Sequence, residues 1–101
     1  MAAEALARDV VEERLGRLPG WALTDGGITR TYQLASHFAA AAMVVHIAQL
    51  QEELNHHSQL TLGYHSVSLT VNTHDAGGAV TEKDIELARR VEATAAGHAA
   101  K

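Results

Sequence analysis

The sequence predicts one α+β domain, in which helices cover one face of a four-stranded antiparallel sheet. Two pairs of short β-prone runs are each separated by a turn, the pattern of two β-hairpins. Three other stretches carry apolar residues three or four positions apart, as amphipathic helices do. The predicted order over residues 1–101 is α-β-β-α-β-β-α, which suits a sheet with helices on one side.

The first helix is predicted over residues 3–16, where charged residues fall between apolar positions such as Leu6 and Val10. Gly16 and the Pro19-Gly20 pair end it. The first hairpin joins residues 21–24 to residues 28–34.

The predicted turn of the first hairpin is Asp25-Gly26-Gly27, because glycine adopts positive φ without steric cost. Ser36 is a suitable N-cap for the second helix, which runs to Leu54. This helix has one apolar stripe: Ala40, Met43, Ile47, Leu50 and Leu54.

The second hairpin is predicted from two alternating runs, residues 60–64 and 67–71, with His65-Ser66 as the turn. Residues 74–78 then form a loop. Thr81 and Asp84 resemble a capping box for the last helix, which ends at Gly97, and residues 99–101 fray. The apolar face of that helix is Ile85, Ala88, Val91 and Ala95.

The composition of the chain argues against several classes of function. The net charge of −4 argues against a general nucleic-acid binder, which needs a basic patch. The absence of cysteine excludes disulfides, thiolate catalysis and cysteine zinc sites. The sequence has no secretory leader and no apolar run of about 18 residues, so we expect a cytoplasmic protein. Only 4% of residues are aromatic, so the core is thin and oligomerisation is favoured.

Three of the seven histidines occupy positions that suit chemistry. His56 and His57 follow the second helix, whose C-terminal partial charge favours imidazolium, and His74 follows a strand. Imidazoles transfer protons near neutral pH. Alternatively, these residues form a polar helix end and a loop without chemistry. Three others are expected to be surface or boundary residues: His37, His46 and His98.

A metal site is a weaker interpretation of the same residues. Three histidines can bind zinc. Adjacent helical residues, however, project about 100° apart and do not share a face. We therefore expect no metal site. No nucleophile elbow accompanies the serines, and the Gly-Gly pairs lack the spacing of a phosphate-binding loop.

The spacing Glu52-x3-His56-His57-Ser58, followed by Tyr64, His74 and Asp84, resembles the signature of the pterin-4a-carbinolamine dehydratase family. The resemblance runs from about residue 15 to residue 95. It implies an α+β fold with a four-stranded antiparallel sheet and a homodimer or homotetramer.

The resemblance also implies a hydro-lyase reaction. A 4a-hydroxytetrahydropterin loses water to give quinonoid dihydropterin, in recycling of tetrahydrobiopterin-type cofactors. That elimination needs an acid for the departing hydroxyl and a base for a ring N–H proton, and imidazoles supply both. The pterin is the substrate, and no metal or redox cofactor is needed.

By the same resemblance, His56 and His74 perform the acid and base steps, in either order, and His57 binds and orients the pterin. Glu52 orients a histidine or accepts a pterin N–H. The full predicted substrate site is Glu52, Asn55, His56, His57, Asn72, Thr73, His74 and Asp75. For Asp84 we favour a helix-cap role.

The sequence departs from the family pattern in the same segment. Ser58 stands where proline is common, and Leu60 where an aromatic residue is usual. These changes bear on substrate affinity more than on the acid and base residues. They keep a second interpretation open, in which the chain is a non-catalytic protein-binding, assembly or dimerisation module on the same scaffold.

Overall fold

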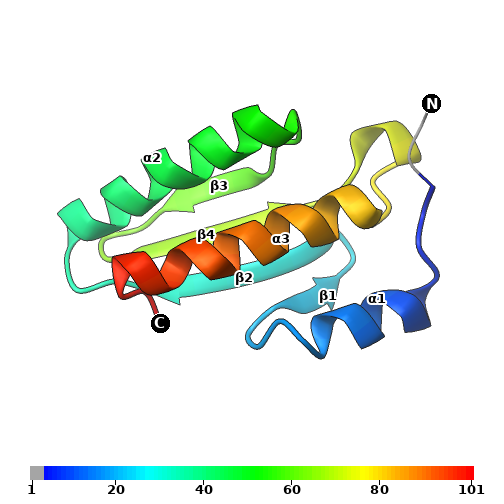
Figure 1. Ribbon diagram of the computed structural model, residues 1–101, viewed down its shortest axis with the longest axis horizontal. Coiled ribbons are helices and arrows are strands. Elements are labelled where there is room, and N and C mark those ends of the chain that lie inside the picture. The colour runs from blue at the N-terminus through cyan, green and yellow to red at the C-terminus, as the bar shows by residue number, and fades with distance from the viewer. Residues whose placement is uncertain (1–3) are drawn as a thin grey trace.

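A computed structural model describes residues 4–101, which form three helices on one side of a four-stranded antiparallel sheet (Figure 1). The elements in chain order are α1 (Arg8–Leu15), β1 (Ala22–Thr24), β2 (Gly27–Gln33), α2 (His37–Leu54), β3 (Gln59–Leu62), β4 (Ser66–Val71) and α3 (Glu82–Ala95). Short 3₁₀ turns cover His74–Ala76 and Ala96–His98. The predicted fold class is confirmed.

The strand order is β1-β2-β4-β3, so the two hairpins join through β2 and β4 at the centre of the sheet. Ile28 pairs with Val71 and Tyr32 with Val67, and all four are fully buried. Side chains alternate across a strand, so the residues directly before and after each of these positions point to the other face. There, hydroxyls bond across the strands: the Oγ1 of Thr31 lies 2.9 Å from the Oγ of Ser68.

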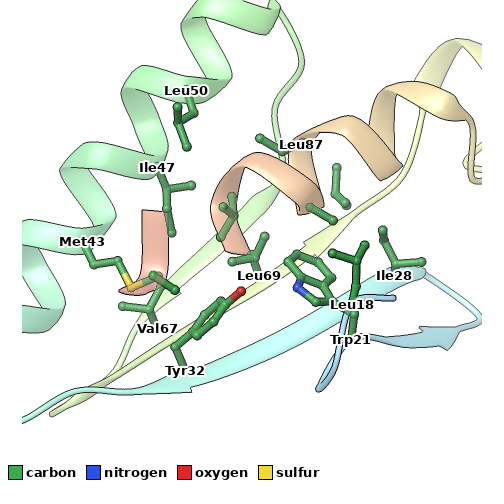
Figure 2. Packing of buried hydrophobic residues seen from close by; sticks show 14 of the residues in the cluster. Leu18, Trp21, Ile28, Tyr32, Met43, Ile47, Leu50, Val67, Leu69 and Leu87 are labelled. Atoms are coloured by element: carbon green, nitrogen blue, oxygen red, sulfur yellow. The ribbon is translucent and has the colours of Figure 1, made fainter. Parts of the chain in front are cut away.

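The core lies between this sheet and the helices α2 and α3 (Figure 2). The apolar stripe of α2 points into it, with Leu50 at the end that leads to the histidines. Ala40 and Ala88 are fully buried, on α2 and α3 respectively, and these two helices contact each other. Small side chains let the helices approach closely, which is how an alanine-rich chain builds a packed interior.

The carboxylate of Glu92 binds two aromatic residues of the core. The Tyr32 hydroxyl donates to Oε1 of Glu92 at 2.6 Å, and the Trp21 indole N–H donates to the same oxygen at 3.3 Å. Burial raises the pKa of Tyr32, and the hydrogen bond and charge of Glu92 raise it further. The phenol therefore stays protonated and holds α3 against β2.

The prediction of the first helix was wrong at its start. Residue 3 lies outside the described residues, and α1 begins only at Arg8. The backbone N–H of Leu6 instead donates to the carbonyl of Val80 at 2.9 Å. This tertiary contact draws residues before the helix toward the segment that leads into α3.

The second turn and the C-terminus also differ from expectation. β3 ends at Leu62, and Ser66 is already part of β4, so the turn is Gly63–His65 rather than His65-Ser66. Tyr64 is 80% exposed because it lies in that turn. The last helix ends at Ala95 rather than Gly97. Residues 99–101 are held, since the N–H of Lys101 donates to the Gln33 carbonyl at 2.9 Å.

None of the helices formed by residues 4–101 combines the length and the apolar character needed to cross a lipid bilayer.

Candidate active site

The C-terminus of α2 turns the chain sharply and separates the two adjacent histidines. Asn55 adopts a left-handed conformation (φ 49°, ψ 45°), as a residue just after a helix often does. The N–H of His56 then donates back to the Gln51 carbonyl at 3.0 Å. As a result His56 is buried, at 9% exposed, whereas the next residue, His57, is exposed.

His56 is bound to the buried carboxylate of Asp84. Its Nε2 lies 2.5 Å from Oδ1 of Asp84, which is fully buried at the start of α3. An ionised carboxylate only accepts hydrogen bonds, so Nε2 is the nitrogen of His56 that donates here. The arrangement fixes the direction of the ring.

The second oxygen of Asp84 binds the other two segments at this end of the molecule. Its Oδ2 accepts from the Thr81 backbone N–H and from the Thr73 hydroxyl, both at 2.8 Å. The Thr73 and Thr81 hydroxyl oxygens are 2.6 Å apart. The predicted capping box of Thr81 and Asp84 is confirmed. One carboxylate therefore caps α3. It also joins residues 55–58, which follow α2 (the α2 exit), to residues 72–79, which follow β4 (the β4 exit).

His57 is supported from the surface. Its Nε2 lies 2.8 Å from Oε2 of Glu52, one turn back on α2, and both side chains are more than half exposed. An exposed pair of this kind contributes little to stability. It does orient an imidazole that remains accessible to a ligand.

His74 begins the 3₁₀ turn directly after Thr73, and both His74 and Asp75 are exposed. In Figure 1 the green end of α2 and the yellow segment that follows β4 lie at the same end of the molecule. Asn72, by contrast, donates from Nδ2 to the Gly26 carbonyl at 2.7 Å, so its amide is engaged by the β1–β2 turn. Thr73 is engaged by Asp84.

A small groove of about 250 Å³ borders the buried histidine. Its lining residues are Leu54, His56, Glu82, Lys83 and Glu86. A larger hollow of about 550 Å³ lies on the open face of the sheet. Of the predicted site residues, only Asn72 lines it. The groove beside His56 is therefore the better candidate for chemistry, because the larger hollow has no acid or base in its lining.

The three histidines that were predicted to be surface or boundary residues lie away from the groove beside His56. His37 contacts the Tyr64 carbonyl oxygen at 2.8 Å through Nδ1, and its side chain is exposed. His46 Nδ1 lies 3.0 Å from His98 Nε2, which joins α2 to the C-terminal turn. Within residues 4–101, no group of three or more His, Asp or Glu side chains is arranged to hold a metal ion.

The sequence did not indicate Gln51 as a site residue, and it indicated only part of the role of Asp84. Gln51 is buried on α2, where it binds Ser58 through its side chain. Asp84 was recognised as a cap but not as the partner of His56. The capping pattern was a usable signal for Asp84. No local signal pairs it with a histidine 28 positions away.

Comparison with known proteins shows which family the chain resembles over nearly its whole length. Residues 4–94 match the family model described as pterin 4 alpha carbinolamine dehydratase. A Streptomyces coelicolor protein that carries the name pterin-4-alpha-carbinolamine dehydratase is 71% identical, over 99% of each chain. A Streptomyces avermitilis protein of the same name is 66% identical, also over 99% of each chain.

A solved structure is also similar to this chain. The crystal structure of a transcriptional coactivator/pterin dehydratase from Brucella melitensis superposes with a TM-score of 0.82 and 33% identity. The similarity covers 89% of this chain and 97% of that one.

Proposed function

Since the chain belongs to the pterin-4a-carbinolamine dehydratase family, we propose that it is a hydro-lyase that converts 4a-hydroxytetrahydropterin to quinonoid dihydropterin and water. The observation that carries the proposal is the Asp84 carboxylate. It binds His56 on one side and the residue before His74 on the other. The signature histidines therefore lie on segments that one buried group holds together.

The two proton transfers of the dehydration suit His56 and His74. Asp84 keeps a proton on Nε2 of His56, so Nδ1 is the acceptor for a pterin ring N–H proton. His74 is exposed and donates a proton to the departing 4a-hydroxyl. One proton enters the water that leaves and one remains on the base, so the reaction balances without a metal or a redox cofactor.

The remaining predicted residues bind or support the pterin in this proposal. His57, held by Glu52, contacts the flat ring from the exposed side. Asn55 and Asp75 are exposed at the same two exits and line the site. The Asn72 and Thr73 side chains have intramolecular partners, so they support the loop that carries His74.

The test is a coupled assay in which a hydroxylase generates the 4a-hydroxytetrahydropterin. The purified protein should accelerate dehydration, and His74→Ala should remove most of the excess rate. His37→Ala is the matched control, since His37 is exposed but lies at the other end of α2, and it should leave the rate unchanged. Elemental analysis of the active preparation should find no stoichiometric metal. No acceleration by the wild-type protein would refute the proposal.

A second candidate function is a protein-binding or assembly module. The similar Brucella melitensis protein is described as a transcriptional coactivator/pterin dehydratase. In this chain Phe38 is 84% exposed and Val45 is 69% exposed, both on α2. Co-purification of a stoichiometric protein partner, with no turnover of the pterin, would favour this function over the enzyme.

We also propose that the protein is a cytoplasmic homodimer or homotetramer. β3 is an edge strand, and an unpaired edge is a template for pairing with another chain. The exposed Phe38 and Val45 supply apolar area on the neighbouring helix. Light scattering should give two or four chains per particle, and a monomer would contradict the proposal. Cell fractionation tests the location.

A further inference from the structure

Gln51 is a polar residue in the last turn of α2, yet it is only 6% exposed. Its backbone carbonyl accepts from the His56 N–H at 3.0 Å. Its side-chain oxygen, Oε1, accepts from the Ser58 N–H at 2.9 Å and also from the Ser58 hydroxyl. One residue thus binds the neighbours of His57 on both sides.

These contacts matter because they hold the chain beyond the buried bond between His56 and Asp84. The Glu52 side chain contacts the imidazole of His57, and both of these side chains are more than half exposed. Ser58 is half-buried, and Gln51 binds both its backbone and its side chain.

We infer that Gln51 is a positioning residue: it fixes the backbone of residues 56–58 and thereby sets the direction of the His57 imidazole toward the substrate. The inference rests on the proposed dehydration, which gives His57 its task. A displacement of about 1 Å at such a group costs up to about a hundredfold in rate, so even partial loss of the contact is measurable.

Hydrogen exchange on the wild-type protein tests the contact directly. The Ser58 amide should exchange slowly although it lies between elements, because Oε1 of Gln51 accepts its hydrogen. The His57 amide is the internal control, since it has no acceptor among residues 4–101 and should exchange fast. Equal, fast exchange at both positions would overturn the inference.

Kinetics and NMR test the positioning. Gln51→Leu removes the acceptor but keeps an apolar volume in the buried site. We expect kcat to fall about tenfold with KM within about twofold, and the His57 imidazole resonances to shift. Gln51→Glu keeps an oxygen acceptor and should retain kcat within about threefold. Gln49→Leu is the matched control, because Gln49 is exposed on the same helix, and it should change neither readout.

The outcomes separate this inference from the proposed function. If the wild-type protein shows no turnover, the dehydratase proposal fails, while exchange and imidazole resonances still decide the role of Gln51. A folded Gln51→Leu protein with wild-type kcat and unmoved His57 resonances would overturn the inference. If Gln51→Leu does not fold, Ser58→Ala replaces it. That variant loses the hydroxyl contact only and should still shift the His57 resonances; unmoved resonances would refute the inference.

Discussion

The exits from α2 and β4 have the same design but are held in different ways. In each exit a buried residue that binds Asp84 comes directly before an exposed histidine. These pairs are His56 and His57 after α2, and Thr73 and His74 after β4. After α2, one backbone bond from the His56 N–H to the Gln51 carbonyl is followed by side-chain contacts: Oε1 of Gln51 binds Ser58, and Glu52 binds the imidazole of His57.

After β4, the backbone does the holding. The carbonyl of Thr73 accepts from Ala76 and Gly78, and the N–H of Thr73 donates to Ala79 at 2.9 Å. Gly77 and Gly78 supply the positive φ values of 71° and 86° that close this loop. The two exits should therefore respond to different substitutions. Beyond the residue bonded to Asp84, side-chain contacts predominate at the α2 exit and backbone hydrogen bonds predominate at the β4 exit.

The largest effect should come from Asp84→Ala, which breaks both exits together. It leaves His56, the Thr73 hydroxyl and the Thr81 N–H without their shared acceptor. Loss of one partner from such a buried network costs about 3–5 kcal/mol of unfolding free energy. Urea unfolding followed by circular dichroism measures it. Asp75→Ala, at an exposed position, is the control and should cost little; a loss below about 1 kcal/mol for Asp84→Ala would contradict the shared anchor.

Thr73→Val should weaken the β4 exit alone. Valine keeps the branched shape of a strand residue but cannot donate to Oδ2 of Asp84. The expected cost is about 1–3 kcal/mol of unfolding free energy. Hydrogen exchange should accelerate at Ala76 and Gly78 while Ser58 stays protected. Thr31→Val, on the open sheet face, is the matched control. Loss of protection at Ser58 would show that the two exits are not held separately.

Substitutions at the left-handed residues should destabilise the β4 exit but not the α2 exit. Gly77→Ala places a Cβ in open space, so only the strained backbone counts, at about 1 kcal/mol of destabilisation. Asn55→Gly relieves a positive φ of 49° and should leave stability unchanged or slightly higher. Thermal unfolding of both variants measures this. A destabilised Asn55→Gly protein would mean that the Asn55 side chain holds the α2 exit.

The smallest effect on stability should come from Glu52→Gln. The pair with His57 is exposed, so the unfolding free energy should change by less than about 0.5 kcal/mol. If Glu52 orients His57 for the pterin, kcat/KM should still fall severalfold. Stability and turnover measured on one preparation separate the two. Unchanged kcat/KM would remove Glu52 from the site.

Most of the fold was predictable because it is written in local patterns. The stripe on α2, the Asp-Gly turn of the first hairpin, the Ser36 cap and the capping box each involve residues a few positions apart. The errors occurred where a distant residue decides. Residues 4–7 have helical spacing, but Leu6 bonds to Val80. Tyr64 continues an alternating pattern, but β4 begins two residues later.

The candidate site was predictable as a set of residues but not as an arrangement. Helix-end position and family spacing indicated His56, His57 and His74. Nothing in the local sequence distinguishes a buried His56 from an exposed His57, because that depends on the left-handed turn at Asn55. In the sequence Gln51 resembles the other polar residues of α2. Only its contact with Ser58 in the folded chain distinguishes it.

Most elements, their apolar faces and the family could be predicted from the sequence, because periodicity, capping and motif spacing involve residues close together in the chain. Tertiary structure alone decided which histidine is buried, which carboxylate binds it, and how the two exits meet. The physical reason is that a buried carboxylate must satisfy its oxygens with whatever donors the fold brings near. For Asp84 these donors come from positions 56, 73 and 81, which only the packing of α2, β4 and α3 places together.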